Sequence, residues 1–238
     1  MSIMLPQHIG VILDGNRRFA KELMKRPWDG HKVGLEKARQ VLEWSCEQGI
    51  KYITAYTLSL ENLQSRPKAE LKLILNYFEN EMDDILSNIG HVVHKYKVNT
   101  RFIGRTHILP DGLQAKMNAV AKKTAGYKNH TLNIAIAYGG QQEIVDAVKK
   151  ILVEGLSGVI KPSDVDETML KHHMYTNGQP YPDMILRTGG EKRLSNFMPF
   201  QSVYSELIFT DVMWPALTKK DFQKALDEFS DRKRRFGE

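Results

Sequence analysis

Short apolar runs rich in β-branched residues alternate along this chain with stretches of helical periodicity, and this alternation limits the fold more than any other feature. The predicted strands are 8–13, 51–59, 98–103, 131–138, 183–187 and 204–209. Helical spacing covers 33–48, 68–88, 110–125, 140–154 and 218–235. Such alternation favours a mostly parallel sheet flanked by helices, because parallel neighbours need a crossover connection. The sequence therefore predicts an α/β fold.

The chain is expected to form one domain over residues 1–238. It contains no internal repeat, no low-complexity tract and no linker-like composition, and its loosest stretch, 155–182, is rich in glycine and proline. The single cysteine, Cys46, excludes an internal disulfide and suits a reducing compartment. No apolar run approaches the length of a membrane span, and the N-terminus lacks a signal-peptide pattern. We expect a cytoplasmic protein, and attachment to a membrane surface is left open.

The net charge of +6 favours an anionic partner, which could be a phosphorylated ligand, a membrane surface or a nucleic acid. Much of the basic run at 232–235 is diluted by neighbouring acids, as on a solvated helix face. The sequence carries no signature of RNA or DNA binding, so no nucleic-acid partner is expected.

Polar clusters follow four of the predicted strands, at 14–16, 59–62, 138–140 and 187–191. Open parallel sheets bind their ligands outside the carboxyl ends of the strands. Four clusters at four such ends therefore predict one common crevice.

The cluster at 14–18 joins an acid to two guanidinium groups. Asp14 opens a glycine turn that Arg17 and Arg18 close. Arginine pairs match phosphate oxygens, while a neighbouring acid repels phosphate unless a divalent cation lies between them. The segment thus indicates a metal-bridged polyphosphate. A plain strand, turn and charged helix start would give the same five residues.

The stretch 187–197 predicts a second anion site, because it combines Arg187, Arg193 and Ser195 with a glycine turn. Glu206 follows as an acid inside an apolar strand, and it therefore needs a partner. A metal or an arginine would serve, the latter as an ordinary buried ion pair.

Taken together, these blocks resemble the cis-prenyltransferases, the undecaprenyl (poly-cis) diphosphate synthase family. The resemblance covers nearly the whole chain through the blocks 8–20, 30–34, 59–62, 138–140, 187–197, 204–215 and 234–237. It implies a transferase that condenses isopentenyl diphosphate with an allylic prenyl diphosphate in cis configuration, with Mg²⁺, to give a polyprenyl diphosphate. A homodimer is implied as well.

The resemblance also implies roles for individual residues. Asp14 and Asn62 would be catalytic, and Asp14 and Glu206 would hold the metal. The allylic diphosphate would be bound by Gly15, Asn16, Arg17, Arg18, Phe19, His31, Ser59, Leu60, Glu61, Leu63 and Arg66. Isopentenyl diphosphate would be bound by Arg187, Arg193, Leu194 and Ser195.

The helix predicted at 68–88 has a wide apolar face, which would either pack into the core or wall an apolar tunnel for a long substrate. The acids Asp83 and Asp84 lack the spacing of the paired aspartate motifs of trans-prenyl synthases and indicate a solvated helix face. His91 and His94 lack convincing companions for a zinc site and are expected to be structural or surface residues.

Departures from the family pattern leave the acceptor open. Three residues, 63–65, separate the Glu-Asn pair from Arg66 where the family has two, and Gln141 stands where an arginine is usual. The same allylic site could therefore prenylate another carbon or hydroxyl. A non-catalytic subunit of a prenyltransferase is the other alternative, although such subunits tend to lose the first-strand aspartate that is present here as Asp14.

Overall fold

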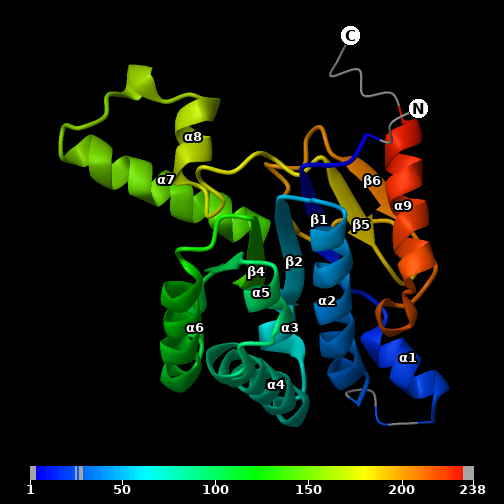
Figure 1. Cartoon of the computed structure of the whole chain (residues 1–238). Coiled ribbons are helices and arrows are strands. Elements are labelled where there is room, and N and C mark those ends of the chain that lie inside the picture. Colours follow the sequence, from blue (N-terminus) through cyan, green and yellow to red (C-terminus); the bar gives the residue numbers. More distant parts are fainter. Residues whose placement is uncertain (1–3, 25, 27–28, 233–238) are drawn as a thin grey trace.

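The computed structural model describes residues 4–24, 26 and 29–232, and six parallel strands within them form one sheet in the order β3-β4-β2-β1-β5-β6 (Figure 1). The strands are β1 His8–Ile12, β2 Tyr52–Ser59, β3 Val98–Ile103, β4 His130–Tyr138, β5 Met184–Arg187 and β6 Glu206–Phe209. The α-helices are α1 Asn16–Glu22, α2 Gly30–Glu47, α3 Leu60–Ser65, α4 Lys68–Ser87, α5 Val92–Lys95, α6 Asp111–Thr124, α7 Gly140–Leu156, α8 Glu167–His173 and α9 Lys219–Asp231. The α/β prediction is confirmed.

The predicted long elements are present with small shifts at their ends. The short helices α1, α3, α5 and α8 were not predicted, because a helix of one or two turns shows little periodicity. Helix α9 ends at Asp231, and the rest of the predicted basic helix and the closing block lie outside the described residues beyond 232. None of the described helices has both the length and the apolar character that a membrane span requires.

Two buried clusters cover the two faces of the sheet. Along β1, Ile9 and Val11 enter a large cluster with residues of α2, α4, α6 and α9, while Ile12 enters a smaller cluster on the other face. Phe197 and Tyr138 belong to the smaller cluster. Successive residues of a strand point to opposite faces, so one strand serves both layers. Strands buried on both faces explain the continuous apolar runs of the sequence.

Helices α1 and α2 approach each other closely beside the end of β1. A Cβ atom on Gly30, the first residue of α2, would lie 2.0 Å from the carbonyl oxygen of Asn16. Trp214 fixes the same region, because its indole Nε1 donates to the Gly34 carbonyl at 2.8 Å and its amide donates to the Asp14 carbonyl at 2.9 Å. The turn that follows β1 is therefore held from two sides.

We predict that Gly30→Ala destabilises the protein by roughly 1–3 kcal/mol, because its methyl group must push the Asn16 backbone away. The measurement is chemical denaturation followed by circular dichroism. Gly112→Ala is the matched control, since a Cβ atom at this helical glycine meets nothing within 4 Å. That control should stabilise the protein by about 0.5–1 kcal/mol. Equal stabilities for the two variants would contradict the close approach of α1 and α2.

Candidate active site

The carboxyl ends of β1 and β5 bring an acid and an arginine together from distant parts of the chain. The two strands are neighbours, with Ile12 in register with Arg187. Two residues after Ile12, the Asp14 carboxylate accepts a hydrogen bond from Arg187 Nη2 at 2.7 Å. The two basic segments predicted as separate anion sites thus meet at one place.

Asp14 is fixed through both its backbone and its side chain. The Thr188 hydroxyl lies 3.1 Å from the Asp14 amide and 2.8 Å from the Asp14 carbonyl oxygen, so it can accept from one and donate to the other. Arg187 donates to Oδ2, and Arg18 donates to Oδ1 at 3.2 Å. The carboxylate is still 28% exposed, so a ligand can reach it.

A cleft of about 420 Å³ opens beside this carboxylate. Its lining consists of Leu13, Asp14, Gly15, Asn16, Arg17, Arg18, Lys21, His31 and Arg66. Gly15 makes the turn possible, because its φ of 108° is left-handed and a Cβ atom there would lie 2.8 Å from Met213. Four cationic side chains face one carboxylate in this lining, so the cleft is suited to a polyanion.

Glu70, which the sequence analysis missed, lies beneath this cleft at the start of α4. Its side chain is fully buried and contacts His31 Nε2 at 3.1 Å and Arg66 Nη1 at 2.5 Å. Arg17 Nε is 3.6 Å away. Glu70 thus holds three side chains of the cleft at once. The sequence signal for this contact was that Glu70 follows Arg66 by four residues. Acid–base pairs at this spacing usually lie on exposed helix surfaces, however.

The ionisation of this group follows from its contacts. Burial raises the pKa of Glu70, but the hydrogen bond from His31 and the charge of Arg66 outweigh burial and leave the pKa below its usual value. Burial lowers the pKa of His31, and the hydrogen bond to Glu70 offsets only part of this shift. We infer an ionised Glu70 and a neutral His31 near neutral pH.

The second basic segment is arranged around Arg187. This side chain is buried, and its Nη1 donates to Ser195 Oγ at 2.8 Å and to the Arg193 carbonyl oxygen. The Arg193 side chain is exposed and pairs with Glu191, and Leu194 packs against the smaller buried cluster. Arg187 therefore positions Asp14 and the 193–195 loop, and Arg193 is available to a ligand.

Helix α3 carries the remaining predicted residues. Ser59 Oγ caps this helix by accepting the Asn62 amide at 3.0 Å, and Asn62 is exposed. Glu61 accepts a hydrogen bond from Asn196 Nδ2 at 2.8 Å, which joins α3 to the loop that follows Arg193. Among the described residues, Phe19, Ser59, Leu60, Glu61 and Leu63 are not part of the lining of the cleft beside Asp14.

The structure does not bring Glu206 together with Asp14 within one chain. Glu206 begins β6 in register with Met184, whereas Asp14 neighbours Arg187 at the opposite end of β5. Glu206 Oε2 accepts a hydrogen bond from Arg232 Nη1 at 3.0 Å. The ion-pair alternative is therefore present, and the metal role of Glu206 remains a prediction.

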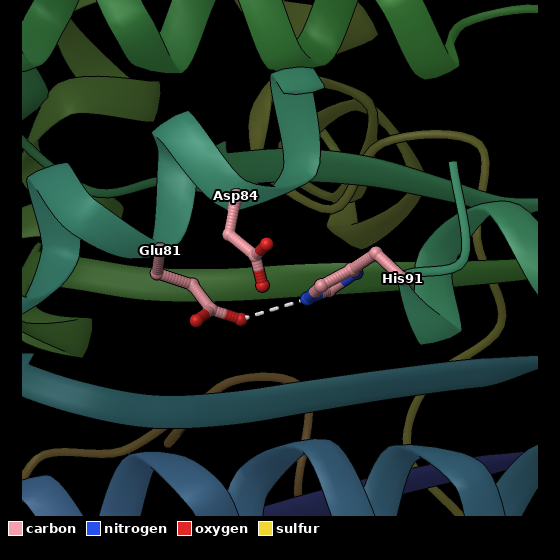
Figure 2. A group of neighbouring side chains, drawn as sticks. All are labelled: Glu81, Asp84 and His91. Carbon is pink, nitrogen blue, oxygen red and sulfur yellow. Dashed lines mark hydrogen bonds and ion pairs between the residues drawn. The ribbon is translucent and has the colours of Figure 1, made fainter. Parts of the chain in front are cut away.

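A second polar cluster lies at the far end of α4, where Glu81 and Asp84 point toward His91 (Figure 2). Ligand atoms of the three residues lie within 4.8 Å of one another. Arg39 of α2 donates to both Glu81 oxygens and lies 2.8 Å from Asp84 Oδ2. His91 Nδ1 accepts the Val93 amide, so Nε2 carries the proton and donates to Glu81 at 3.1 Å.

These contacts argue against a metal at the second cluster, because a cation would have to displace both the guanidinium and the imidazole proton. Burial raises the pKa of Glu81, but hydrogen bonds from His91 and Arg39 outweigh it and keep the carboxylate ionised. His91 is structural, as expected, and Asp84 is half-buried rather than part of a solvated face. The acidic companions of His91 were missed because the turn between α4 and α5 brings them together.

Known proteins resemble the chain over almost its full length. The family model described as "Putative undecaprenyl diphosphate synthase" matches residues 12–237. A tritrans,polycis-undecaprenyl-diphosphate synthase (geranylgeranyl-diphosphate specific) from Methanopyrus kandleri is 44% identical over 233 residues, which are 98% of this chain and 85% of that protein. An isoprenyl transferase from Thermus thermophilus is 42% identical over 237 residues, which are 98% of this chain and 89% of that protein.

Solved structures agree with the sequence comparison. A lavandulyl diphosphate synthase from Lavandula x intermedia, in complex with dimethylallyl diphosphate, superposes with a TM-score of 0.92 at 31% identity and covers 98% of this chain and 99% of that one. A "probable undecaprenyl diphosphate synthase" from Campylobacter jejuni superposes with a TM-score of 0.80 at 29% identity and covers 100% of both chains.

We predict that Glu70→Gln lowers the free energy of unfolding by roughly 1–3 kcal/mol, because buried donors lose a charged acceptor. It should also lower the pKa of His31 further, since the hydrogen bond to Glu70 raises it. Denaturant titration and proton NMR of the imidazole would measure the two effects. Glu79→Gln on the same helix is the control, because Glu79 forms only a loose pair with Lys116 at 3.7 Å. An unchanged His31 titration in Glu70→Gln would contradict the proposed coupling.

Proposed function

Because this chain belongs to the family of undecaprenyl diphosphate synthases, we propose that it condenses isopentenyl diphosphate with an allylic prenyl diphosphate, in cis configuration and with Mg²⁺, to make a polyprenyl diphosphate. The observation that carries the proposal is the position of Asp14. Its carboxylate is held by Arg18 and Arg187 at the edge of a cationic cleft, and it remains open to a ligand.

The cationic cleft would bind the allylic diphosphate. Arg17, Arg18 and Arg66 supply positive charge, and the first amides of α1 point their hydrogens away from the helix. Glu70 holds Arg66 and His31 in place before the substrate arrives. A site whose donors are already arranged loses little free energy in reorganisation when negative charge develops on the leaving diphosphate.

The residues around Asp14 fit a magnesium ion. Mg²⁺ commonly takes one or two carboxylates together with substrate phosphates and waters. Asp14 offers an accessible carboxylate beside the cationic cleft, and Arg18, which is half exposed and 3.2 Å from Oδ1, would have to move from that oxygen to make room for the ion. When bound, the ion would neutralise charge on the departing diphosphate.

The loop around Arg193 would bind isopentenyl diphosphate. Arg193 and Ser195 are exposed at the same strand ends as Asp14, and Arg187 holds the loop from below. Asn62 lies on α3, which Glu61 and Asn196 tie to this loop. We assign Asn62 the role of assisting proton removal from the condensing unit.

A second candidate function keeps the allylic site but uses a different acceptor. The solved structure of a lavandulyl diphosphate synthase supports this alternative, because that protein has the same fold but is named for a different synthase activity. The non-catalytic alternative lacks such support, because Asp14, Asn62, Arg187 and Arg193 are all in place.

The deciding experiment incubates the purified protein with Mg²⁺, labelled isopentenyl diphosphate and allylic primers of several lengths. We expect labelled polyprenyl products, sized by chromatography after removal of the diphosphate, and loss of product on chelation of the metal. Consumption of a primer while all label stays in isopentenyl diphosphate would favour the other acceptor.

In the same assay, Asp14→Asn should lower kcat by about 10²–10³-fold, because it removes one charge at the reacting diphosphate and keeps the side-chain shape. Asp227→Asn on the exposed face of α9 is the control and should be near wild type. Activity close to wild type in Asp14→Asn would refute its role.

We also propose that the protein is a homodimer. Helix α7 carries an exposed apolar stripe at helical spacing, Val145, Val148, Leu152 and Leu156, and such stripes favour association with a second surface. Light scattering after gel filtration should give a dimer mass, and Leu152→Glu with Val148→Glu should convert it to a monomer. A monomeric wild type would contradict this proposal.

A further inference from the structure

A separate pocket of about 450 Å³ lies beside β3, at the edge of the sheet, where α7 and α8 pack against each other (Figure 1). Residues 101–104 of β3 and the turn after it form one wall, and Lys150 and Glu154 of α7 form another. The end of α8 and the chain after it, at 172–175 and 177, complete the lining. Among the described residues, none lines both this pocket and the cationic cleft, which opens three strands away beside β1. We call it the α7–α8 pocket.

Arg101 brings a positive charge into the α7–α8 pocket without a carboxylate to balance it. Ile103, two residues further along β3, belongs to the smaller buried cluster, so the Arg101 side chain leaves the sheet on that same face and enters the pocket. Its Nη2 donates to the Tyr175 carbonyl oxygen at 3.3 Å, which uses only one of the five N–H donors of a guanidinium. Burial lowers the pKa of Arg101, and no carboxylate of the described residues offsets this shift.

The other arginines that are at least partly buried in the described part of the chain all have such a carboxylate. Each forms an ion pair of 3.0 Å or less, and they are Arg39, Arg66, Arg105, Arg187 and Arg232. Removing a cation from water is unfavourable unless an opposite charge accompanies it. Arg101 is therefore an exception that an anionic ligand would explain.

Glu154 is the one acid among the described residues that line the pocket, and His173 balances its charge. His173 Nε2 contacts Glu154 Oε2 at 3.1 Å, and its Nδ1 contacts the Met169 carbonyl oxygen at 2.8 Å. Both oxygens are acceptors, and only a protonated imidazole carries a hydrogen on each nitrogen. The protonated ring therefore pairs with Glu154, and the charges of Arg101 and Lys150 are left over.

Lys150 is the second cation of the pocket. Its Nζ lies 5.8 Å from the centre of the Tyr175 ring, and the carbonyl oxygen of the same Tyr175 accepts the hydrogen bond from Arg101. Lys150 follows Val148 by two residues, which turns it by about 200° around α7. The pocket therefore opens on the side of α7 opposite to the apolar stripe that we assign to the dimer contact.

We propose that the α7–α8 pocket is a second anion site, which binds a phosphate group that is either free or part of a small molecule. The guanidinium of Arg101 matches two phosphate oxygens, and Lys150 supplies a point charge beside it. A phosphate dianion balances both cations, whereas a monocarboxylate balances only one. The pocket has the volume of an ordinary small-molecule site, so it leaves room for the rest of a phosphorylated molecule. The inference does not depend on the proposed function.

The test titrates inorganic diphosphate, glycerol 3-phosphate and acetate into the whole chain at constant ionic strength, and follows the imidazole protons by NMR. His172 and His173 report on the α7–α8 pocket, and His31 reports on the cationic cleft. We expect both phosphate compounds to shift the His172 and His173 signals to saturation, and acetate to leave them in place. Whichever phosphate compound has the lower Kd shows whether the site prefers a free or an esterified phosphate. Equal shifts with acetate would overturn the inference.

Arg101→Gln and Lys150→Gln should each raise the Kd measured at His173 by about tenfold, because each removes a charged donor to the ligand. Lys149→Gln is the matched control: it removes the same charge from the next position of α7, outside the lining of this pocket, and should leave the Kd unchanged. Lys150 is exposed, so its variant tests the site even if Arg101→Gln does not fold. Equal effects of Lys149→Gln and Lys150→Gln, or shifts confined to His31, would overturn the inference and leave the proposed function standing.

Discussion

The ion pair between Asp14 and Arg187 is the interaction on which the rest of the site depends. It joins the ends of two neighbouring parallel strands that lie far apart in the sequence, and it exists because the sheet places Ile12 and Arg187 in register. Arg187 is buried, so it cannot turn away into solvent, and it carries the 193–195 loop on its other nitrogen. The pairing of strands thereby sets the geometry of both proposed diphosphate sites.

Carboxylates balance the positive charge of the arginines around this ion pair. Arginines that would repel one another in an empty cleft are each held by a carboxylate: Asp14 contacts Arg18 and Arg187, and Glu70 contacts Arg66. The two acids keep these cations in place without neutralising the cleft as a whole. The free energy needed to bring these like charges together is therefore supplied when the protein folds and not when the substrate binds.

The alternation of strands and helices predicted the parallel sheet, and the polar residues at strand ends predicted one crevice that contains the segments of Asp14 and Arg187, but not the contact between these two residues. The alternation repeats along the chain, and the meeting of strand ends follows from the topology of a parallel sheet, so both can be predicted from the sequence. Glu70 was beyond sequence reasoning because its burial depends on how α4 packs against His31 and Arg66. Glu206 was recognised as an acid that needs a partner, but the pattern of a strand does not say that the partner is Arg232. Glu81 and Asp84 approach His91 only because the chain turns between α4 and α5.

Helix α4 bears one buried acid in each of two polar clusters, Glu70 beneath the cationic cleft and Glu81 beside Arg39 and His91, and this has a consequence for how related sequences can differ. Eleven residues separate Glu70 from Glu81, which is close to three whole turns, so both acids share one side of the helix. A single inserted residue would rotate the second acid by about 100° away from Arg39 and His91 while moving it only about 1.5 Å along the helix axis. Insertions between Glu70 and Glu81 can therefore preserve both clusters only in near-whole-turn increments.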